Sequence, residues 1–369
     1  MKLTSRRLHS FIAICAIASL SLAAANIYAQ QTAEPVPPIT GAFGGAGQPR
    51  PAAVMNGVQN QTPSPDDVVA MQDALPNKAF ATPKQPRKIL IFCEAAGFVH
   101  RSIPLAAATI KALGEKTGAW SATITYDPLV FTADNLKQYD LIFLDSNTGS
   151  FLDDPNDPQL TAARRKAFLD FVRNGKGLAA IHAGGTDSYR GDDHNDRNSP
   201  NAKANLAAPA SSFPPMGAEN PTSAWPDLTK ASGALFKWHW SYPTLVTLKL
   251  DDPNSPLTAM FQGQEFGIHD EVYTFAQGSF SRKDIHVLTS IDYSKMSDAD
   301  KAKEPAATRR TDGDYPLSWV RREGKGRVFI EALGHDEHFY FMPAMLQHLL
   351  AGTQYALGDL PADDSPSMK

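Results

Sequence analysis

The chain has 369 residues, of which 42% are hydrophobic, 9% aromatic and 20% charged. This apolar fraction is large enough to fill a core, which excludes a chain that is disordered throughout. The formal net charge is −4, and no block of basic residues occurs beyond the extreme N-terminus. A general nucleic-acid-binding protein is therefore excluded, because such a protein gathers many cations on one face.

The N-terminus has the pattern of a cleaved export signal. Three cations precede a short apolar run over residues 11–25, and small residues that suit a signal-peptide cleavage site follow near Ala29. The run is shorter than the roughly 20 apolar residues that a membrane span needs. We therefore predict a signal peptide over residues 1–29, no membrane anchor after its cleavage, and a secreted or periplasmic protein. General secretory export and twin-arginine export both remain open.

Two segments flank the predicted folded domain. Residues 30–86 are rich in proline and glycine without a helical or alternating period, which predicts a flexible leader with at most a short helix near residues 65–75. Residues 358–369 are polar and predict a frayed tail. The folded domain is expected over residues 87–357. Once the signal is removed Cys93 is the one cysteine left, so no intrachain disulfide is expected.

Strands and helices alternate along the first half of this domain. Continuous apolar runs, typical of parallel strands buried on both faces, occur at residues 88–93, 141–144 and 177–181, and a further strand is predicted at 122–126. Apolar residues at helical spacing indicate helices between these strands. Short connections between alternating strands and helices predict an α/β fold with a mostly parallel, doubly wound sheet.

Two of the strand ends carry polar and catalytic residue types. His100 and Arg101 follow the first strand, and His182 directly follows the fourth. In open parallel sheets ligands bind outside the carboxyl ends of the strands. A single histidine there could simply bond a loop carbonyl, but the topology brings these two ends together, which favours a site.

Five motifs then resemble, in chain order, those of the ThuA-like (trehalose utilisation) family. They are Gly97–Ile103, Gly177–Ala183, Phe236–His239, His269–Tyr273 and Gly326–His335. The resemblance covers roughly residues 88–357. It implies a three-layer, flavodoxin-like sandwich of the class I glutamine amidotransferase-like type, and an association with bacterial carbohydrate metabolism.

The resemblance also excludes one activity. Amidotransferases of this fold place a nucleophilic cysteine on a strained turn between a strand and a helix, with small residues two positions before and after it. Ala180 and Gly184 supply those small residues here, but His182 stands at the apex. Imidazole cannot form the thioester that glutamine hydrolysis needs, so glutaminase activity is excluded.

The amidotransferase resemblance has a second part, near the last helix. His335 follows a late strand, as the histidine of the amidotransferase triad does, and is expected to face His182; a helix-capping cluster is the alternative. Alternation places Glu271 and Asp270 on opposite sides of a strand. We assign acid–base roles to these two histidines and to one or both carboxylates.

Further residues are expected to bind substrate. Aromatic faces stack on sugar rings and histidines supply hydrogen bonds, which singles out Trp238 and His239; core packing is the alternative for the tryptophan. Arg101, Tyr273 and His100 complete this set. Side chains of the histidines and of one carboxylate should fall within about 10 Å of a common centre.

A divalent metal is a hypothesis, because several histidines and carboxylates lie in the motifs but far apart in sequence. No Gly-x-Gly-x-x-Gly follows the first strand, so a dinucleotide cofactor is not expected. Residues 187–224 carry few aliphatic side chains and predict an insertion loop, solvated and able to act as a lid beside His182.

Two functions remain open at this point. The first is an exported enzyme that acts on a sugar or keto-sugar derivative by histidine and carboxylate chemistry. The second is an inactive module that binds a carbohydrate or a partner, because loss of the nucleophile at the turn after a strand is also seen in proteins that have lost their enzymatic activity. The expected partner in both is a small carbohydrate, and the oligomeric state stays open.

Overall fold

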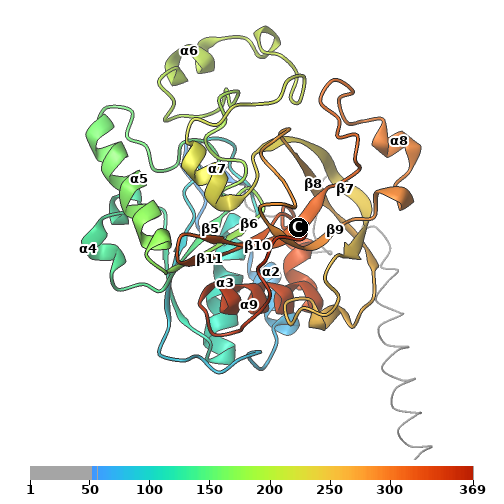
Figure 1. Cartoon of the computed structure of the whole chain (residues 1–369). Coiled ribbons are helices and arrows are strands. Elements are labelled where there is room, and N and C mark those ends of the chain that lie inside the picture. Colours follow the sequence, from blue (N-terminus) through green and yellow to red (C-terminus); the bar gives the residue numbers. More distant parts are fainter. Residues whose placement is uncertain (1–51, 56, 369) are drawn as a thin grey trace, which may run out of the picture. The chain divides into compact units, whose positions relative to one another are not determined.

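The computed structural model describes residues 52–55 and 57–368, and its central feature is a mixed sheet of nine strands (Figure 1). The predicted signal peptide and the leader up to residue 51 lie outside the described residues. Five neighbouring strands run parallel, in the order β4 (Ser121–Thr125), β3 (Lys88–Phe92), β5 (Leu141–Asp145), β6 (Gly177–Ile181) and β11 (Gly326–Glu331). Four antiparallel strands extend the sheet, in the order β10 (Pro316–Glu323), β9 (His286–Ile291), β7 (Phe236–Leu250) and β8 (Phe266–Phe275).

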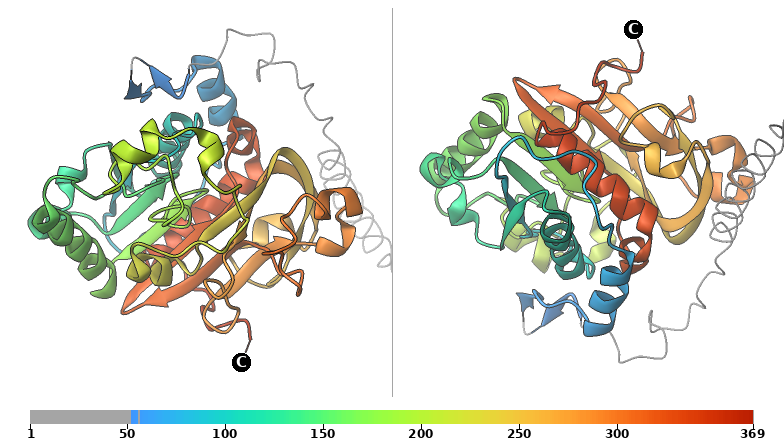
Figure 2. Two further views of the ribbon diagram at one scale, coloured as in Figure 1. Left: turned by 90° about the horizontal axis from the view of Figure 1, so that it is seen from above. Right: turned by 90° about the horizontal axis from the view of Figure 1, so that it is seen from below.

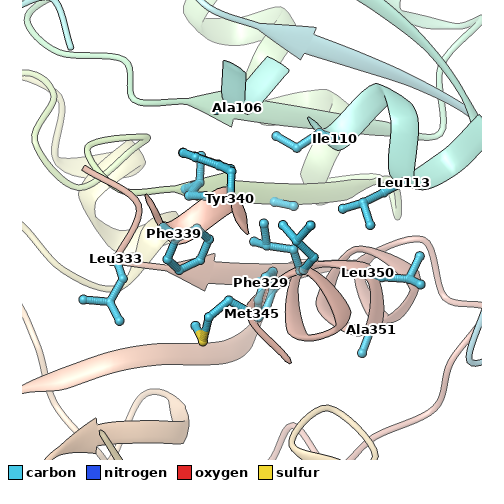
Figure 3. Close-up of a cluster of buried hydrophobic side chains, with 14 of the residues drawn as sticks. Ala106, Ile110, Leu113, Phe329, Leu333, Phe339, Tyr340, Met345, Leu350 and Ala351 are labelled. Atoms are coloured by element: carbon cyan, nitrogen blue, oxygen red, sulfur yellow. The ribbon is translucent and has the colours of Figure 1, made fainter. Parts of the chain in front are cut away.

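Helices cover both faces of the parallel strands because alternate strand residues point to opposite sides. Ile89 and Phe143 pack into one core with α3 (Ile103–Thr117) and α9 (Pro343–Ala356), whereas Leu90 and Ile142 pack into the other with α5 (Pro158–Arg173) and α7 (Pro226–Ser232). Figure 3 shows the first core, where Ala106, Ile110 and Leu113 of α3 lie near Leu350 and Ala351 of α9 and Phe329 of β11. The predicted three-layer α/β sandwich is thus confirmed.

The remaining elements are short. They are the helices α2 (Pro65–Ala74), α4 (Ala133–Leu136), α6 (Ala202–Ala207) and α8 (Asp298–Lys301), the strands β1 (Val54–Met55) and β2 (Val58–Gln59), and five 3₁₀ turns at Pro128–Val130, Ala210–Ser212, Ala259–Phe261, Tyr293–Lys295 and Glu337–Phe341. No helix among the described residues has the length and apolar character needed to cross a membrane.

The folded body extends beyond the predicted limits of residues 87–357 at both ends. In the supposed leader, Met71 of α2 is 1% exposed and belongs to the core that contains α3 and α9. In the supposed tail, the Asp359 carboxylate accepts hydrogen bonds from the Arg87 guanidinium at 2.6–3.2 Å. The Ser367 amide also donates to the Ile285 carbonyl. The short helix expected near residues 65–75 is present as α2, but its packing and that of the C-terminal segment were not expected, because the residues that anchor them lie far away in sequence.

The long strand β7 brings the antiparallel half of the sheet to the carboxyl ends of the parallel half. Only Leu248–Leu250 of β7 pair with β9, whereas its first residues pair with β8 alone. The Phe236 amide then donates to the Thr186 carbonyl at 2.8 Å, just after β6. This contact places the β7–β8 ribbon beside the loop that follows His182. Figure 2 shows the same ribbon from above and from below relative to the view of Figure 1.

Candidate active site

His182 occupies a strained turn directly after β6. Its φ of 53° lies in the left-handed region, while its amide still donates to the Glu331 carbonyl of β11 at 2.7 Å. A side chain at Gly184 would collide with the Leu144 carbonyl oxygen, so only glycine fits there. The expected elbow is therefore present, with a fully buried histidine at its apex.

Three further side chains converge on His182 from three other segments. His100 comes from the loop between β3 and α3, His335 from the loop after β11, and Glu271 from β8. One ligand atom from each of the four residues lies within 4.8 Å of all the others. Three of the four histidines expected at a common centre therefore lie together with one carboxylate, and the fourth, His239, lies beside Glu271. We call His100, His182, Glu271 and His335 the His₃Glu cluster.

The contacts inside the cluster centre on one nitrogen. His182 Nε2 lies 3.2 Å from His100 Nε2, 3.3 Å from His335 Nδ1 and 3.8 Å from Glu271 Oε1. Glu271 Oε1 lies 3.5 Å from His335 Nδ1. On the other side of the ring, His182 Nδ1 lies 3.2 Å from the Ala332 carbonyl oxygen, which can only accept a hydrogen bond. The neutral ring therefore carries its proton on Nδ1 and directs a lone pair at the cluster.

Burial sets the protonation states of the cluster. It lowers the pKa of His182 and of His100 well below 6.5, with a smaller contribution from the neighbouring imidazoles, and it lowers the pKa of His335 to about 4. Burial, assisted by Asp270, raises the pKa of Glu271 to about 9. Without a bound cation, the cluster at neutral pH thus holds three neutral imidazoles and a protonated carboxyl group. Three nitrogens and one oxygen of this kind could also hold a divalent metal.

A cavity of about 170 Å³ opens beside the cluster. His100 and Glu271 form part of its lining, together with His239, Tyr273 and Phe236 of the β7–β8 ribbon. His239 Nδ1 lies 3.4 Å from Glu271 Oε2, and burial lowers the pKa of His239 to about 4. The Tyr273 ring lies against the His182 ring, with 4.4 Å between centroids. The cavity therefore combines neutral imidazoles with aromatic faces.

The insertion supplies the opposite wall of the cavity. Asp187, Arg190 and Asp193 line it, and the Arg190 guanidinium lies 2.9 Å from Asp187 and over the Phe236 ring at 4.7 Å. Burial raises the pKa of Asp187 to about 7, against the lowering effect of Arg190.

The insertion is also fastened to the carboxyl ends of β3 and β5. The Arg197 amide donates to the Ala96 carbonyl at 2.8 Å, and the Ser150 hydroxyl donates to Asp196 at 2.6 Å. Asp196 is only 3% exposed. The expectation of a solvated loop was therefore wrong for this part of the insertion, because its charged residues find partners on the sheet.

Three of the predicted site residues lie away from the cluster. Asp270 points to the other face of β8, where it accepts a hydrogen bond from the Gly334 amide at 2.7 Å, so it supports the loop of His335 rather than lining the cavity. Arg101 makes a two-pronged ion pair with Glu337 and lines a separate small pocket. Trp238 is half-buried against Trp240 and outside the cavity lining, as its core-packing alternative predicts.

The cavity also contains residues that the sequence did not single out. Asp187, Arg190 and Asp193 stand in the polar stretch after the elbow, and Phe98 stands two residues before His100. Only their position in the sequence could have identified these residues, because they follow the same strand ends as the histidines. Composition alone indicated a solvated loop.

The nine-stranded sheet, the left-handed turn at His182 after β6 and the late histidine beside it are the features that the ThuA-like resemblance implied. The chain belongs to the ThuA family, described as trehalose utilisation, whose model matches residues 88–206 and 216–356. The gap in this match falls within the insertion. No curated protein matches the chain significantly.

Comparison with solved structures found one ThuA-like protein with the same fold and others with lower similarity. The crystal structure of a putative ThuA-like protein from Bacteroides uniformis ATCC 8492 is 19% identical, with a TM-score of 0.50, and the match covers 78% of this chain and 98% of that chain. A putative ThuA-like protein from Parabacteroides merdae ATCC 43184 is 17% identical, with a TM-score of 0.44 and coverage of 76% and 93%. A β-galactosidase from Bacillus circulans sp. alkalophilus is 10% identical, with a TM-score of 0.38 and coverage of 74% and 32%.

Proposed function

We propose that the chain is an exported enzyme that acts on a sugar or keto-sugar derivative bound in the cavity beside the His₃Glu cluster. The observation that carries this proposal is the convergence of His100, His182, Glu271 and His335 at one end of a lined cavity. Four ionisable side chains from four segments are costly to bury together, and groups with strongly shifted pKa values of this kind concentrate at active sites.

The lining suits a sugar ring. Tyr273 and Phe236 contribute apolar ring atoms to the lining, which suit the C–H groups of a pyranose, and Asp187, Arg190 and Asn195 offer hydrogen bonds to hydroxyl groups. A volume of about 170 Å³ supports the binding of a single ring rather than of an oligosaccharide. Phe98, which is 57% exposed, also lines the cavity. The cavity therefore reaches solvent at this residue, where a substituent on the sugar could extend outward.

The residues around Glu271 can move protons. The Glu271 carboxyl group, whose pKa burial raises to about 9, can donate a proton at neutral pH, while the neutral imidazoles of His239 and His335 can accept one. They lie 3.4 Å and 3.5 Å from the carboxylate oxygens. This arrangement supports acid–base chemistry on a sugar hydroxyl, carbonyl or adjacent C–H group.

Export is proposed from the sequence of the first 29 residues alone. Mass spectrometry of the protein purified from its own cells would show a mature N-terminus near residue 30 if the signal is cleaved. If the protein purified from the exported fraction still began at residue 1, this part of the proposal would be refuted.

The test of activity uses a panel of glycosides and keto-glycosides with two variants and one control. Glu271→Gln and His335→Ala should lower kcat/KM by about 10²–10⁴-fold, the usual contribution of a positioned acid or base. Glu265→Gln, which changes an exposed glutamate directly before β8, should leave turnover unchanged.

The replacement of the elbow nucleophile by histidine favours one competing function, an inactive module that binds a carbohydrate. Binding of panel sugars without turnover by the wild type would establish the module and refute the enzyme.

A further inference from the structure

We propose that the His₃Glu cluster binds one divalent transition-metal ion, Zn²⁺ above all, through His100, His182, Glu271 and His335. The inference deepens the proposed function because it concerns the same site. It starts from geometry: four potential ligand atoms from four different segments point at one small volume. Hydrogen bonding accounts for only one of the contacts at His182, since its unprotonated Nε2 has a single lone pair and two imidazole nitrogens lie 3.2 Å and 3.3 Å from it.

The separations of the ligand atoms match a tetrahedral centre. Zinc–nitrogen bonds of about 2.0–2.1 Å and zinc–oxygen bonds of about 2.0–2.2 Å place neighbouring ligand atoms of a tetrahedron about 3.4 Å apart. The four separations around His182 Nε2 and Glu271 Oε1 are 3.2, 3.3, 3.5 and 3.8 Å. Four of the six separations are thus close to the tetrahedral value and all six lie within 4.8 Å, so a bound metal would draw the four groups closer together.

Outer contacts hold the ligands in place, as they do in metal sites of proteins. The Ala332 carbonyl accepts the Nδ1 proton of His182 and so fixes the tautomer whose Nε2 binds a metal. Asp270 accepts a hydrogen bond from the amide of Gly334, the residue directly before His335. Glu271 keeps its second oxygen 3.4 Å from His239, which lies outside the ligand set. Asp270 is thus a positioning residue for the proposed metal.

The donor set selects the class of metal. Three imidazoles suit Zn²⁺ and its neighbours in the first transition row, whereas Ca²⁺ and Mg²⁺ require mostly oxygen ligands. No thiolate competes, because the described cysteine, Cys93, is buried against Asp145 at 3.6 Å. Since His100 and Glu271 also line the cavity, a metal there would lie next to a bound sugar. When bound, such an ion supplies Lewis acidity toward a sugar oxygen.

Metal content and cobalt spectroscopy test the proposal without any substrate. The purified full-length protein is stripped with a chelator, dialysed against Zn²⁺ or Co²⁺, and measured by elemental analysis and visible absorption. We expect one ion per chain, with cobalt bands typical of nitrogen and oxygen ligands in low coordination. His335→Ala and Glu271→Gln should weaken binding by at least about 100-fold. His239→Gln, a non-ligand histidine in the same cavity, should keep the full metal content.

Each outcome decides a separate question. The metal site would be overturned if a folded wild type bound far less than one ion per chain. It would also be overturned if His335→Ala and Glu271→Gln retained as much metal as the wild type. If His335→Ala fails to fold, His335→Gln, which keeps most of the side-chain volume, replaces it. Full metal binding without turnover of any sugar would support the metal site and count against the enzyme. Turnover by a folded wild type that binds no metal would support the enzyme and overturn the metal site.

Discussion

Replacing Lys237 by methionine should destabilise the protein strongly, because this lysine and Glu304 form an ion pair in which both side chains are 0% exposed. The Lys237 ammonium lies 2.8 Å from Glu304 and donates to the Thr308 carbonyl at 2.6 Å, while the Tyr315 hydroxyl donates to the other Glu304 oxygen at 2.6 Å. The pair fastens residues 304–308 to the start of β7, two residues before His239.

The size of the loss follows from the buried charge that remains. Lys237→Met leaves Glu304 with one hydroxyl partner, and breaking a buried ion pair on one side costs about 3–5 kcal/mol. For about 300 ordered residues, with an unfolding entropy of about 2.1 cal/mol/K per residue, a loss of ~4 kcal/mol lowers Tm by about 6 °C. The double variant Lys237→Met/Glu304→Gln should recover part of this loss, since no charge is then left buried.

Urea unfolding followed by tryptophan fluorescence, together with calorimetry, measures both quantities. The matched control is Lys295→Met, because Lys295 lies 2.8 Å from Glu265 but both side chains are at least 36% exposed. Such a pair contributes about 0–1 kcal/mol. Equal effects of the two substitutions would refute the reasoning, since burial would then have no influence on the cost.

Three further predictions concern the leader, the elbow and a buried histidine. Met71→Ala should cost about 2–5 kcal/mol by chemical denaturation, because Met71 is buried in the core, whereas a flexible leader would show no change. Gly184→Ala should cost at least ~1–3 kcal/mol and weaken cobalt binding, because the added methyl group collides with the Leu144 carbonyl and displaces His182; an unchanged cobalt spectrum would contradict this. Burial lowers the pKa of His348 to about 4 in the folded chain. Between about pH 6.5 and 4 the unfolded chain therefore binds a proton at this residue that the folded chain does not bind. The stability it gives is present above pH 6.5 and is lost, by ~3 kcal/mol, as the pH falls to about 4. His348→Gln should remove this part of the slope, and an identical slope in both proteins would contradict the assignment.

The sequence predicts the parallel half of the fold well because its signals are local. The runs at β3, β5 and β6 are apolar without interruption, as expected for strands covered on both faces, and the positions of His100 and His182 follow from where those strands end. The alternation of β8 also separates Glu271 from Asp270 correctly.

The sequence does not predict features whose partners are distant along the chain. Residues 190–197 are polar, and only the structure shows that Arg190 pairs with Asp187 and that Arg197 bonds the β3 loop. The core role of α2 depends in the same way on packing against α3. Trp238 and His239 are adjacent in sequence, yet only His239 lines the cavity, and composition cannot distinguish them.

Diffraction from crystals soaked with Zn²⁺ and a sugar of the panel, measured across the zinc absorption edge, tests the central claim that one reaction centre lies beside the cavity. The account predicts an anomalous peak about 2.0–2.2 Å from His100, His182, Glu271 and His335, with a sugar ring in contact with Tyr273 and Asp187. A fully occupied zinc or sugar bound elsewhere, with these four side chains unliganded, would contradict it.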